Sequence, residues 1–529
     1  MKRITRLVLA LALLLAAVLA GTAPALAQPI LVPHIDSVVP PVGLVGTPVL
    51  INGTNFGTPN AFSQVTFNGT VAAPTVWQDG FIYTTVPAGA TTGMIAVRTL
   101  GGTSNGVQFT VGSIPRPAQS WYLAEGSTAW GFDTYILMEN TTDIDATVNV
   151  TYNTAQYGRI PRVQPLNIPP SSRVTLHVNS DIPNVDVSTQ LDSSQPIVCE
   201  RSIYWNNRIE GTDSIGTTSP GQTWYMAEGC TTYPFETWLC IQNPSLTTTA
   251  NVDITYMTPS GVVQKPTTTV GPGQRKTLDV SKDVGHCDVS SRVVSDINVV
   301  CERSMYWDNR RGGHDSIGVQ SPSKTWDLAE GSTAWGFQTW LLLQNPNGTA
   351  AKVDVTYMTA GGPVKKPTIT MTPNSRQSIN VNNIVINNDT SIAVSSDSAI
   401  IAERSMYWDN GTGKAGTDTV GFPAPATSIY LAEGSTAWGF ETFVCIQNPN
   451  NKAATVNLVY ETNTGAVAGT ARVVPANSRV TINVASELPN VDTSIKLTST
   501  VPFMAERSMY WHNRGGGHVS VGWVPPAPG

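Results

Sequence analysis

The feature that most constrains the fold is a unit of about 100 residues that occurs four times after residue 120. Each copy opens with a stretch similar to Trp-Tyr-Leu-Ala-Glu-Gly-Ser-Thr and closes with one similar to Glu-Arg-Ser-Met-Tyr-Trp. The opening glutamates, Glu125, Glu228, Glu330 and Glu433, are 103, 102 and 103 residues apart. A fixed period is the signature of a repeat architecture, so we expect function to belong to the array. The sequence itself indicates no particular reaction.

The composition within each repeat indicates short strands and turns. No window of eleven residues sustains the apolar spacing of a helix, whereas runs such as 250–257, 289–294 and 298–307 are β-rich and separated by turn residues. Seven or eight short strands in about 100 residues is typical of a β-sandwich. We therefore predict an all-β fold of tandem immunoglobulin-like β-sandwich modules in an elongated array. A closed propeller is disfavoured, because its blades take about 40 to 50 residues.

The N-terminus has the pattern of an export signal. Lys2 and Arg3 precede an apolar run at 7–19, and the small-residue sequence 25–27 follows. A retained anchor is disfavoured because the run is shorter than the ~20 residues of a spanning helix. Without residues 1–27, the chain holds 28 basic and 37 acidic residues, a net charge of −9. We expect a secreted protein with no membrane span in the mature chain and no nucleic-acid partner.

Residues 33–112 differ from the repeats. They contain, in order, Gly46-Thr47, Asn55-Phe56-Gly57, Val86-Pro87 with Gly89, and Asn105-Gly106 with Phe109. These landmarks closely resemble the IPT/TIG family, an immunoglobulin-like β-sandwich. The resemblance implies a spacer or adhesive unit in a secreted bacterial protein, with no catalytic residues to carry over.

The four repeats resemble an uncharacterised family of secreted bacterial repeat proteins, which supports an extracellular location and adds no chemistry. The predicted domains are a signal peptide at 1–27, the IPT/TIG domain at 33–112, and β-sandwich repeats at 121–217, 224–319, 326–421 and 429–523. Short Pro- and Ser-bearing joints separate the repeats and leave little slack between them.

Recurring acids suggest either catalysis or structure. Glu125 and Glu200, with their counterparts, could be the paired carboxylates of a glycosidase. However, an arginine follows each closing glutamate and would depress the raised pKa that a general acid needs. We favour structural charge pairs between the first and last strands of each repeat. The expected pairs are Arg201 with Glu125, Arg303 with Glu228, Arg404 with Glu330, and Arg507 with Glu433.

Aromatic residues recur after each opening motif, in a segment that we predict to be a loop. Such residues either stack on sugars and anchor partners or fill the end of their own core, and the second use is favoured. The candidate binding residues are Trp130, Phe132, Tyr233, Phe235, Trp335, Phe337, Trp438 and Phe440.

No metal or cofactor motif is evident. Asp186, Asp288 and Asp492 could hold Ca²⁺, but Asx-turns are favoured, and His314 and His518 are expected to be solvated. The six cysteines mostly align with apolar positions, which favours buried free thiols, although a Cys240–Cys301 or Cys230–Cys287 bridge stays open. Cys199 and Cys445 have no partner within their own repeats.

Taken together, these patterns predict a secreted, non-enzymatic surface or matrix protein that acts as a stalk or adhesin. The expected partner is an extracellular polymer, a glycan or a cell-surface protein. The alternative is an extracellular carbohydrate-binding or polysaccharide-processing protein.

Overall fold

The computed structural model describes residues 31–39, 42–43, 48–111, 118–409 and 414–525. The predicted signal peptide lies outside the described residues. Strands make up nearly all the regular structure, so the all-β prediction is confirmed. In the described part of the chain, no helix is long and apolar enough to cross a membrane. The chain divides into two compact units, one holding β1 to β10 and the other holding all four repeats.

The first unit is a two-sheet sandwich. One sheet has the order β1-β3-β7-β6, and the other has β2-β10-β8-β4-β5 with β9 paired to β8. Ile95 and Val97 point into the core while Met94 is exposed, as expected of alternation along a strand. Its strands are β1 (His34–Val39), β2 (Val42–Gly43), β3 (Pro48–Thr54), β4 (Gln64–Phe67), β5 (Thr70–Ala72), β6 (Val76–Trp77), β7 (Phe81–Thr85), β8 (Gly93–Thr99), β9 (Gly102–Thr103) and β10 (Val107–Val111).

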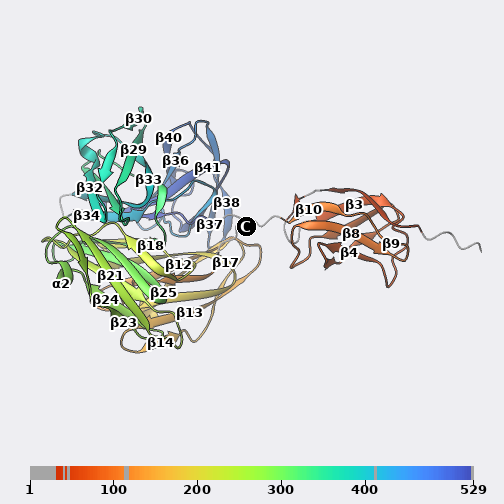
Figure 1. Ribbon diagram of the computed structural model, residues 1–529, viewed down its shortest axis with the longest axis horizontal. Helices are drawn as coiled ribbons and strands as arrows, with labels where there is room; N and C mark the ends of the chain where they lie inside the picture. The colour runs from red at the N-terminus through yellow and green to blue at the C-terminus, as the bar shows by residue number, and fades with distance from the viewer. Residues whose placement is uncertain (1–30, 40–41, 44–47, 112–117, 410–413, 526–529) are drawn as a thin grey trace, which may run out of the picture. The chain divides into compact units, whose positions relative to one another are not determined.

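The four repeats contain the same strands in the same order. In Figure 1 their colours run from yellow in repeat 1 to blue in repeat 4. Repeat 1 consists of β11 (Ala118–Leu123), β12 (Asp133–Asn140), β13 (Ala146–Thr154), β14 (Gly158–Pro161), β15 (Leu166–Ile168), β16 (Ser172–His177), η1 (Val178–Ser180), β17 (Ser188–Trp205) and β18 (Glu210–Ile215). Repeat 2 consists of β19 (Gly221–Met226), β20 (Glu236–Gln242), β21 (Ala250–Thr258), β22 (Gly261–Gln264), β23 (Thr268–Val270), β24 (Arg275–Asp279), α2 (Ser281–Val284), β25 (Ser290–Trp307) and β26 (Gly312–Ile317).

The second pair of repeats follows the same plan. Repeat 3 consists of β27 (Ser323–Leu328), β28 (Phe337–Asn345), β29 (Ala351–Thr359), β30 (Gly362–Lys365), β31 (Ile369–Met371), β32 (Ser375–Asn380), η2 (Val381–Asn383), β33 (Thr390–Asp409) and β34 (Lys414–Val420). Repeat 4 consists of β35 (Ala426–Leu431), β36 (Glu441–Asn448), β37 (Ala454–Thr462), β38 (Gly465–Ala468), β39 (Arg472–Val474), β40 (Ser478–Asn483), η3 (Val484–Ser486), β41 (Thr493–Trp511) and β42 (Gly516–Val521).

One long strand organises each repeat. The first half of β17 pairs with β11 and β13, and its second half pairs with β12 and β18. A single strand therefore belongs to both layers of the module, and it delivers the closing Glu-Arg-Ser motif to the layer formed by β12, β16 and β18.

The last strands of the four repeats meet one another. β18 contacts β26 and β42, and β34 contacts the same two strands, which closes a cycle of four. All four line a small cavity of about 10 Å³. Thr212 Oγ1 donates to Asp315 Oδ1 at 2.5 Å, and Ser214 Oγ accepts from the backbone N–H of Ile317 at 3.1 Å.

The four repeats thus form a closed ring, and the expected elongated arrangement is wrong for this part of the chain. The decisive contact joins repeats 4 and 1, where Arg507 lies 2.7 Å from Glu200. The apolar core also crosses the junctions, since one buried cluster contains residues of all four repeats. The last two strands of each module carry polar groups without partners and apolar side chains without cover in their own module. The next module bonds these polar groups and buries these side chains.

Candidate functional site

The contact surfaces between successive repeats, here called seams, are held by buried ion pairs. Arg201 of repeat 1 lies 2.6 Å from Glu302 of repeat 2 and also contacts Asp315. Glu302 accepts a second bond, from the backbone N–H of Ala124 at 2.7 Å. Burial raises the pKa of Glu302, and the charge of Arg201 opposes that rise.

The same pattern recurs at the other three seams. Arg303 lies 2.6 Å from Asp418 and 3.5 Å from Glu403, Arg404 lies 2.6 Å from Glu506, and Arg507 lies 2.8 Å from Asp213 as well as contacting Glu200.

None of the expected side-chain pairs within repeats is among the ion pairs of the described residues, although the charge of each opening glutamate raises the pKa of the arginine expected to pair with it. Arg201 and Arg404 meet Glu125 and Glu330 only through the backbone carbonyl, at 2.9 Å in both cases. Glu228 and Glu433 likewise are not the ion-pair partners of Arg303 and Arg507. The expectation assumed a module closed on itself, whereas ring closure places the next repeat's closing strand against each arginine.

The opening glutamates pair with a different arginine, which the sequence reading missed. Glu125 lies 2.9 Å from Arg275 of repeat 2, Glu330 lies 3.5 Å from Arg479, and Glu228 lies 3.7 Å from Arg376. At the fourth seam, burial raises the pKa of Glu433 to about 7, against the charges of Arg173 and Arg507. The signal for these arginines was their own recurrence, at positions 173, 275, 376 and 479.

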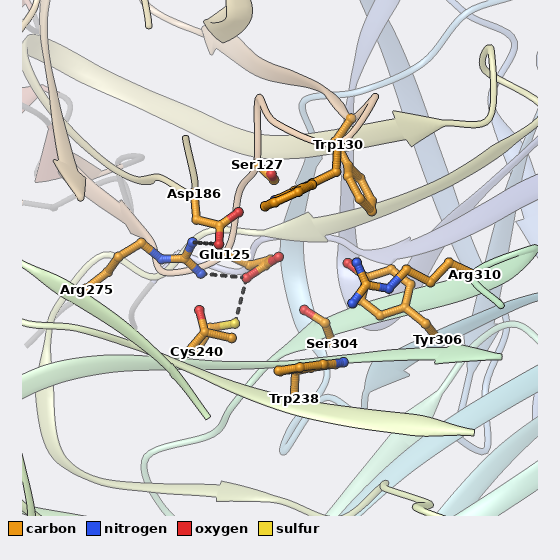
Figure 2. Close-up of a pocket in the computed structure, with 12 residues that line it drawn as sticks. Glu125, Ser127, Trp130, Asp186, Trp238, Cys240, Arg275, Ser304, Tyr306 and Arg310 are labelled. Carbon is orange, nitrogen blue, oxygen red and sulfur yellow. Dashed lines mark hydrogen bonds and ion pairs between the residues drawn. The ribbon is translucent and has the colours of Figure 1, made fainter. Parts of the chain in front are cut away.

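Each seam carries a pocket above these pairs. In the pocket between repeats 1 and 2, of about 390 Å³, Trp130 lies on one side and Trp238, Tyr306 and Arg310 lie on the other (Figure 2). Glu125 lies deeper, where it binds Arg275 and accepts a hydrogen bond from the Cys240 thiol at 2.6 Å.

The four pockets use equivalent residues. The 3–4 pocket has about 420 Å³, the 2–3 pocket about 310 Å³ and the 4–1 pocket about 460 Å³. Their aromatic residues are Trp335, Phe337, Phe443 and Tyr510 in the 3–4 pocket, Phe235, Trp307, Trp340 and Tyr407 in the 2–3 pocket, and Tyr135, Tyr204, Trp438 and Phe440 in the 4–1 pocket.

The loop tryptophans are held in an unusual and exposed conformation. Trp130, Trp335 and Trp438 have φ near +58° and are 80% to 85% exposed, and Tyr233 is also 85% exposed. Positive φ is costly for a bulky residue and is concentrated at functional sites. Hydrogen bonds fix the loop that carries Trp130: Phe132 N–H donates to Ala129 O at 2.9 Å, and Thr134 Oγ1 donates to Ser127 O at 2.6 Å.

The loop phenylalanines lie inward. Phe132 packs 5.4 Å from Trp205 of its own repeat and 6.0 Å from Tyr306 of the next. Phe235, Phe337 and Phe440 make the equivalent contacts. The sequence left two uses open for these aromatic residues, core filling and ligand binding. In the structure, the phenylalanine of each loop fills the seam and the larger aromatic ring faces solvent.

The pockets fall into two pairs. Cys240 and Cys445 bond Glu125 and Glu330 in the 1–2 and 3–4 pockets, while Leu342 and Leu137 take that position in the others. Burial, and then the adjacent carboxylate, raises the pKa of both thiols well above the usual range, so they stay protonated donors. All six cysteines are free, four of them buried.

The histidines expected to be solvated and the aspartates considered for Ca²⁺ have other environments in the structure. His314 and His518 are buried rather than solvated, because their hairpin lies at the ring centre. Burial and the adjacent Arg507 lower the pKa of His518 to about 3, so its Nδ1 accepts from Arg507 at 2.9 Å. Among the described residues no group of acids, histidines and cysteines is arranged to hold a metal. Asp288 instead lies 2.9 Å from Arg376.

Comparisons with known proteins identify parts of the chain. The IPT/TIG domain family matches residues 33–111, which confirms that prediction, and a family of unknown function, DUF5719, matches residues 313–421. The wider resemblance of all four repeats to a secreted bacterial family stays a prediction. No curated protein matches.

Several solved structures align with parts of the chain. A Thermotoga maritima protein, 1070, is 16% identical with a TM-score of 0.18, over 19% of this chain and 94% of its own. The Anabaena sensory rhodopsin transducer is 23% identical with a TM-score of 0.15, over 16% of this chain and 97% of its own. An auxiliary nutrient binding protein from Bacteroides thetaiotaomicron is 11% identical with a TM-score of 0.18, over 69% and 90%. These TM-scores are too low to bear on function.

Proposed function

We propose that this is a secreted, non-enzymatic adhesive protein of a cell surface or extracellular matrix, and that its ring of repeats binds an extracellular polymer. The supporting observation is that the four seam pockets are equivalent and that three of them have a tryptophan held in the exposed, positive-φ conformation at the mouth. Four weak sites on one rigid body add their affinities when a polymer reaches several of them.

The buried acids support a non-enzymatic role. Glu200, Glu302, Glu403 and Glu506 are fully buried. Each contacts an arginine and accepts a backbone N–H from the preceding repeat in the ring. A general acid must reach its substrate, and these carboxyls cannot do so without opening a seam. The recurring Glu-Arg pairs are thus accounted for by holding the ring together.

Co-sedimentation with insoluble polymers tests the proposal. We expect the protein to be retained by at least one of cellulose, chitin, peptidoglycan and collagen fibres, with no release of soluble fragments. Alanine at Trp130, Tyr233, Trp335 and Trp438 together should abolish retention. Retention that survives in this variant would contradict the proposal, as would polymer cleavage that Glu200→Gln abolishes.

A further inference from the structure

The four seam pockets share a chemistry that narrows the choice of ligand, and the inference rests on the function proposed above. We propose that the seam pockets bind neutral sugar rings of an extracellular polysaccharide. In the 1–2, 3–4 and 4–1 pockets, the exposed loop tryptophan covers one face of the sugar and the aromatic residue of the facing strand covers the other. The lining of the 2–3 pocket does not include Tyr233, and there Trp340 of the facing strand provides the aromatic wall.

The aromatic walls come from two different repeats. In the 1–2 pocket, Trp130 belongs to the loop of repeat 1, and Trp238 belongs to β20 of repeat 2 (Figure 2). The corresponding strand residues elsewhere are Tyr135, Trp340 and Phe443. A pyranose has two faces rich in C–H groups, which pack on aromatic rings, and hydroxyls around its edge. Two aromatic walls facing one slot match that shape.

The floor supplies hydrogen-bonding groups at the sugar's edge. Ser127, Thr277 and Ser304 line the 1–2 pocket beside Glu125 and Arg275. Ser304 Oγ is buried and makes no hydrogen bond to the described residues, and Arg275 Nε is also without an acceptor. Buried polar groups are normally satisfied, so these atoms point to a polar ligand or water in the pocket.

The charges of the 1–2 pocket disfavour an ionic ligand because they are already balanced. Arg275 lies 2.9 Å from Glu125 and 4.0 Å from Asp186, and Arg310 lies 3.5 Å from Glu236. A cationic ligand, which aromatic residues also attract, would meet the Arg310 guanidinium, already placed 5.8 Å over Trp238 and 5.4 Å over Tyr306. An anionic ligand would have to displace the acids from Arg275.

The size of the pockets also suits a sugar. Their volumes of about 310 to 460 Å³ lie at the lower end of the range for small-molecule sites. A pocket of this size takes a short stretch of a polymer, so binding to a long chain depends on several pockets acting together.

Native affinity electrophoresis of the whole protein tests the inference. The gels contain dextran, xylan, glucomannan or galactomannan as neutral polysaccharides, polygalacturonate as an anionic one, chitosan as a cationic one, or gelatin as a protein polymer. The pocket variant carries Trp130→Ala, Tyr233→Ala, Trp335→Ala and Trp438→Ala. The matched control also loses one exposed apolar side chain from each repeat, away from the pockets, through Tyr157→Ala, Leu246→Ala, Ile386→Ala and Val473→Ala. Thermal unfolding checks that both variants are folded.

We expect retardation by at least one neutral polysaccharide, an affinity loss of at least about tenfold in the pocket variant, and a control within about twofold of the parent. A second outcome is that only polygalacturonate, chitosan or gelatin retards the parent and that the pocket variant loses this retardation. That outcome would overturn the assignment of a neutral sugar and leave the adhesive function standing. Equal retardation of the pocket variant and the parent, or no retardation in any gel, would overturn the sugar assignment. If insoluble polymers also fail to retain the protein, the proposed function fails with it.

Discussion

At the scale of single residues, Arg404 and Glu506 form the simplest of the seam ion pairs. At the other seams, the closing arginine meets a second acid, Asp213, Asp315 or Asp418, whereas Val519 occupies that position in repeat 4. Arg404 and Glu506 are fully buried and 2.6 Å apart. Breaking a buried pair leaves a charge without compensation, so this pair isolates the contribution of one ion pair to ring stability.

Replacing Arg404 with Met should lower the free energy of unfolding of the ring by about 3 to 5 kcal/mol, because Glu506 stays buried without its cation. Chemical denaturation followed by tryptophan fluorescence measures the loss. The control is Lys282→Ala, which removes an exposed ion pair with Asp279 and should cost less than about 1 kcal/mol. Equal losses in the two variants would show that the buried pair does not hold the seam.

The pocket residues show how far sequence reasoning reaches at this scale. Recurrence in a loop identified the aromatic residues, seven of which line the pockets, Tyr233 being the exception. The partners of Arg201 and Glu125 were missed because they belong to the following repeat. Nothing in the spacing of residues says whether a contact is made within a repeat or with the next one.

At the scale of elements, the seam between repeats 4 and 1 differs from the others where β12 faces β37. Glu139 on β12 and Glu461 on β37 are both buried, and neither carboxyl oxygen of Glu139 has a hydrogen-bond partner among the described residues. The corresponding residues of the other repeats are Gln242, Gln344 and Gln447. Burial, and then the charge of Glu461, raises the pKa of Glu139 well above its usual range, with Glu200 adding to the rise and Lys496 opposing it. Burial raises the pKa of Glu461 to about 7, again opposed by Lys496.

This pair predicts a ring that loses stability as the pH rises. The folded protein keeps protons on the pair that the unfolded chain releases near pH 4.5, so the stabilisation is complete below that pH and is lost through about pH 7. Glu139→Gln should raise the free energy of unfolding at pH 8 by on the order of 1 to 3 kcal/mol and change it little at pH 4.5. Thermal unfolding at both pH values measures this. The control is Glu441→Gln, which removes a half-exposed carboxylate that lies 3.1 Å from Arg514 in repeat 4. Equal pH profiles for Glu139→Gln and the parent would contradict the role of the pair.

Sequence patterns located most strands but not the one that shapes each module. The alternating run at 250–257 falls within β21. The runs at 289–294 and 298–307 were expected to be separate strands, but β25 is continuous from Ser290 to Trp307. Of the three residues between them, Ser295 is buried, Asp296 is exposed and Ile297 is half-buried, because the strand passes there from one layer to the other. In the sequence, the polar pair Ser295-Asp296 resembles a turn.

At the scale of the whole molecule, the ring consists of two similar halves. Repeats 2 and 4 carry Cys240 and Cys445 in their pockets and His314 and His518 at the centre. Repeats 1 and 3 have Leu137 and Leu342, and Thr212 and Thr417, at these positions. The 2–3 seam therefore resembles the 4–1 seam. Ring closure was not predictable from the period alone, since the same period is compatible with a line of modules.

Because repeats 1 and 3 are alike and repeats 2 and 4 are alike, we predict that a fragment of two successive repeats dimerises and so forms a complete ring. In a fragment of residues 118–319, Arg303 of one copy can meet Glu200 and Asp213 of a second copy, as Arg507 does in the intact chain. Two copies would then close a ring of four repeats and bury both open seams, whereas one copy would leave them exposed to water. Sedimentation equilibrium should give twice the mass of the fragment. Arg303→Glu places like charges against Glu200 and Asp213 and should abolish the dimer. A folded, monomeric fragment would show that two repeats are stable with both outer seams open to water and that ring closure is not what holds the four together.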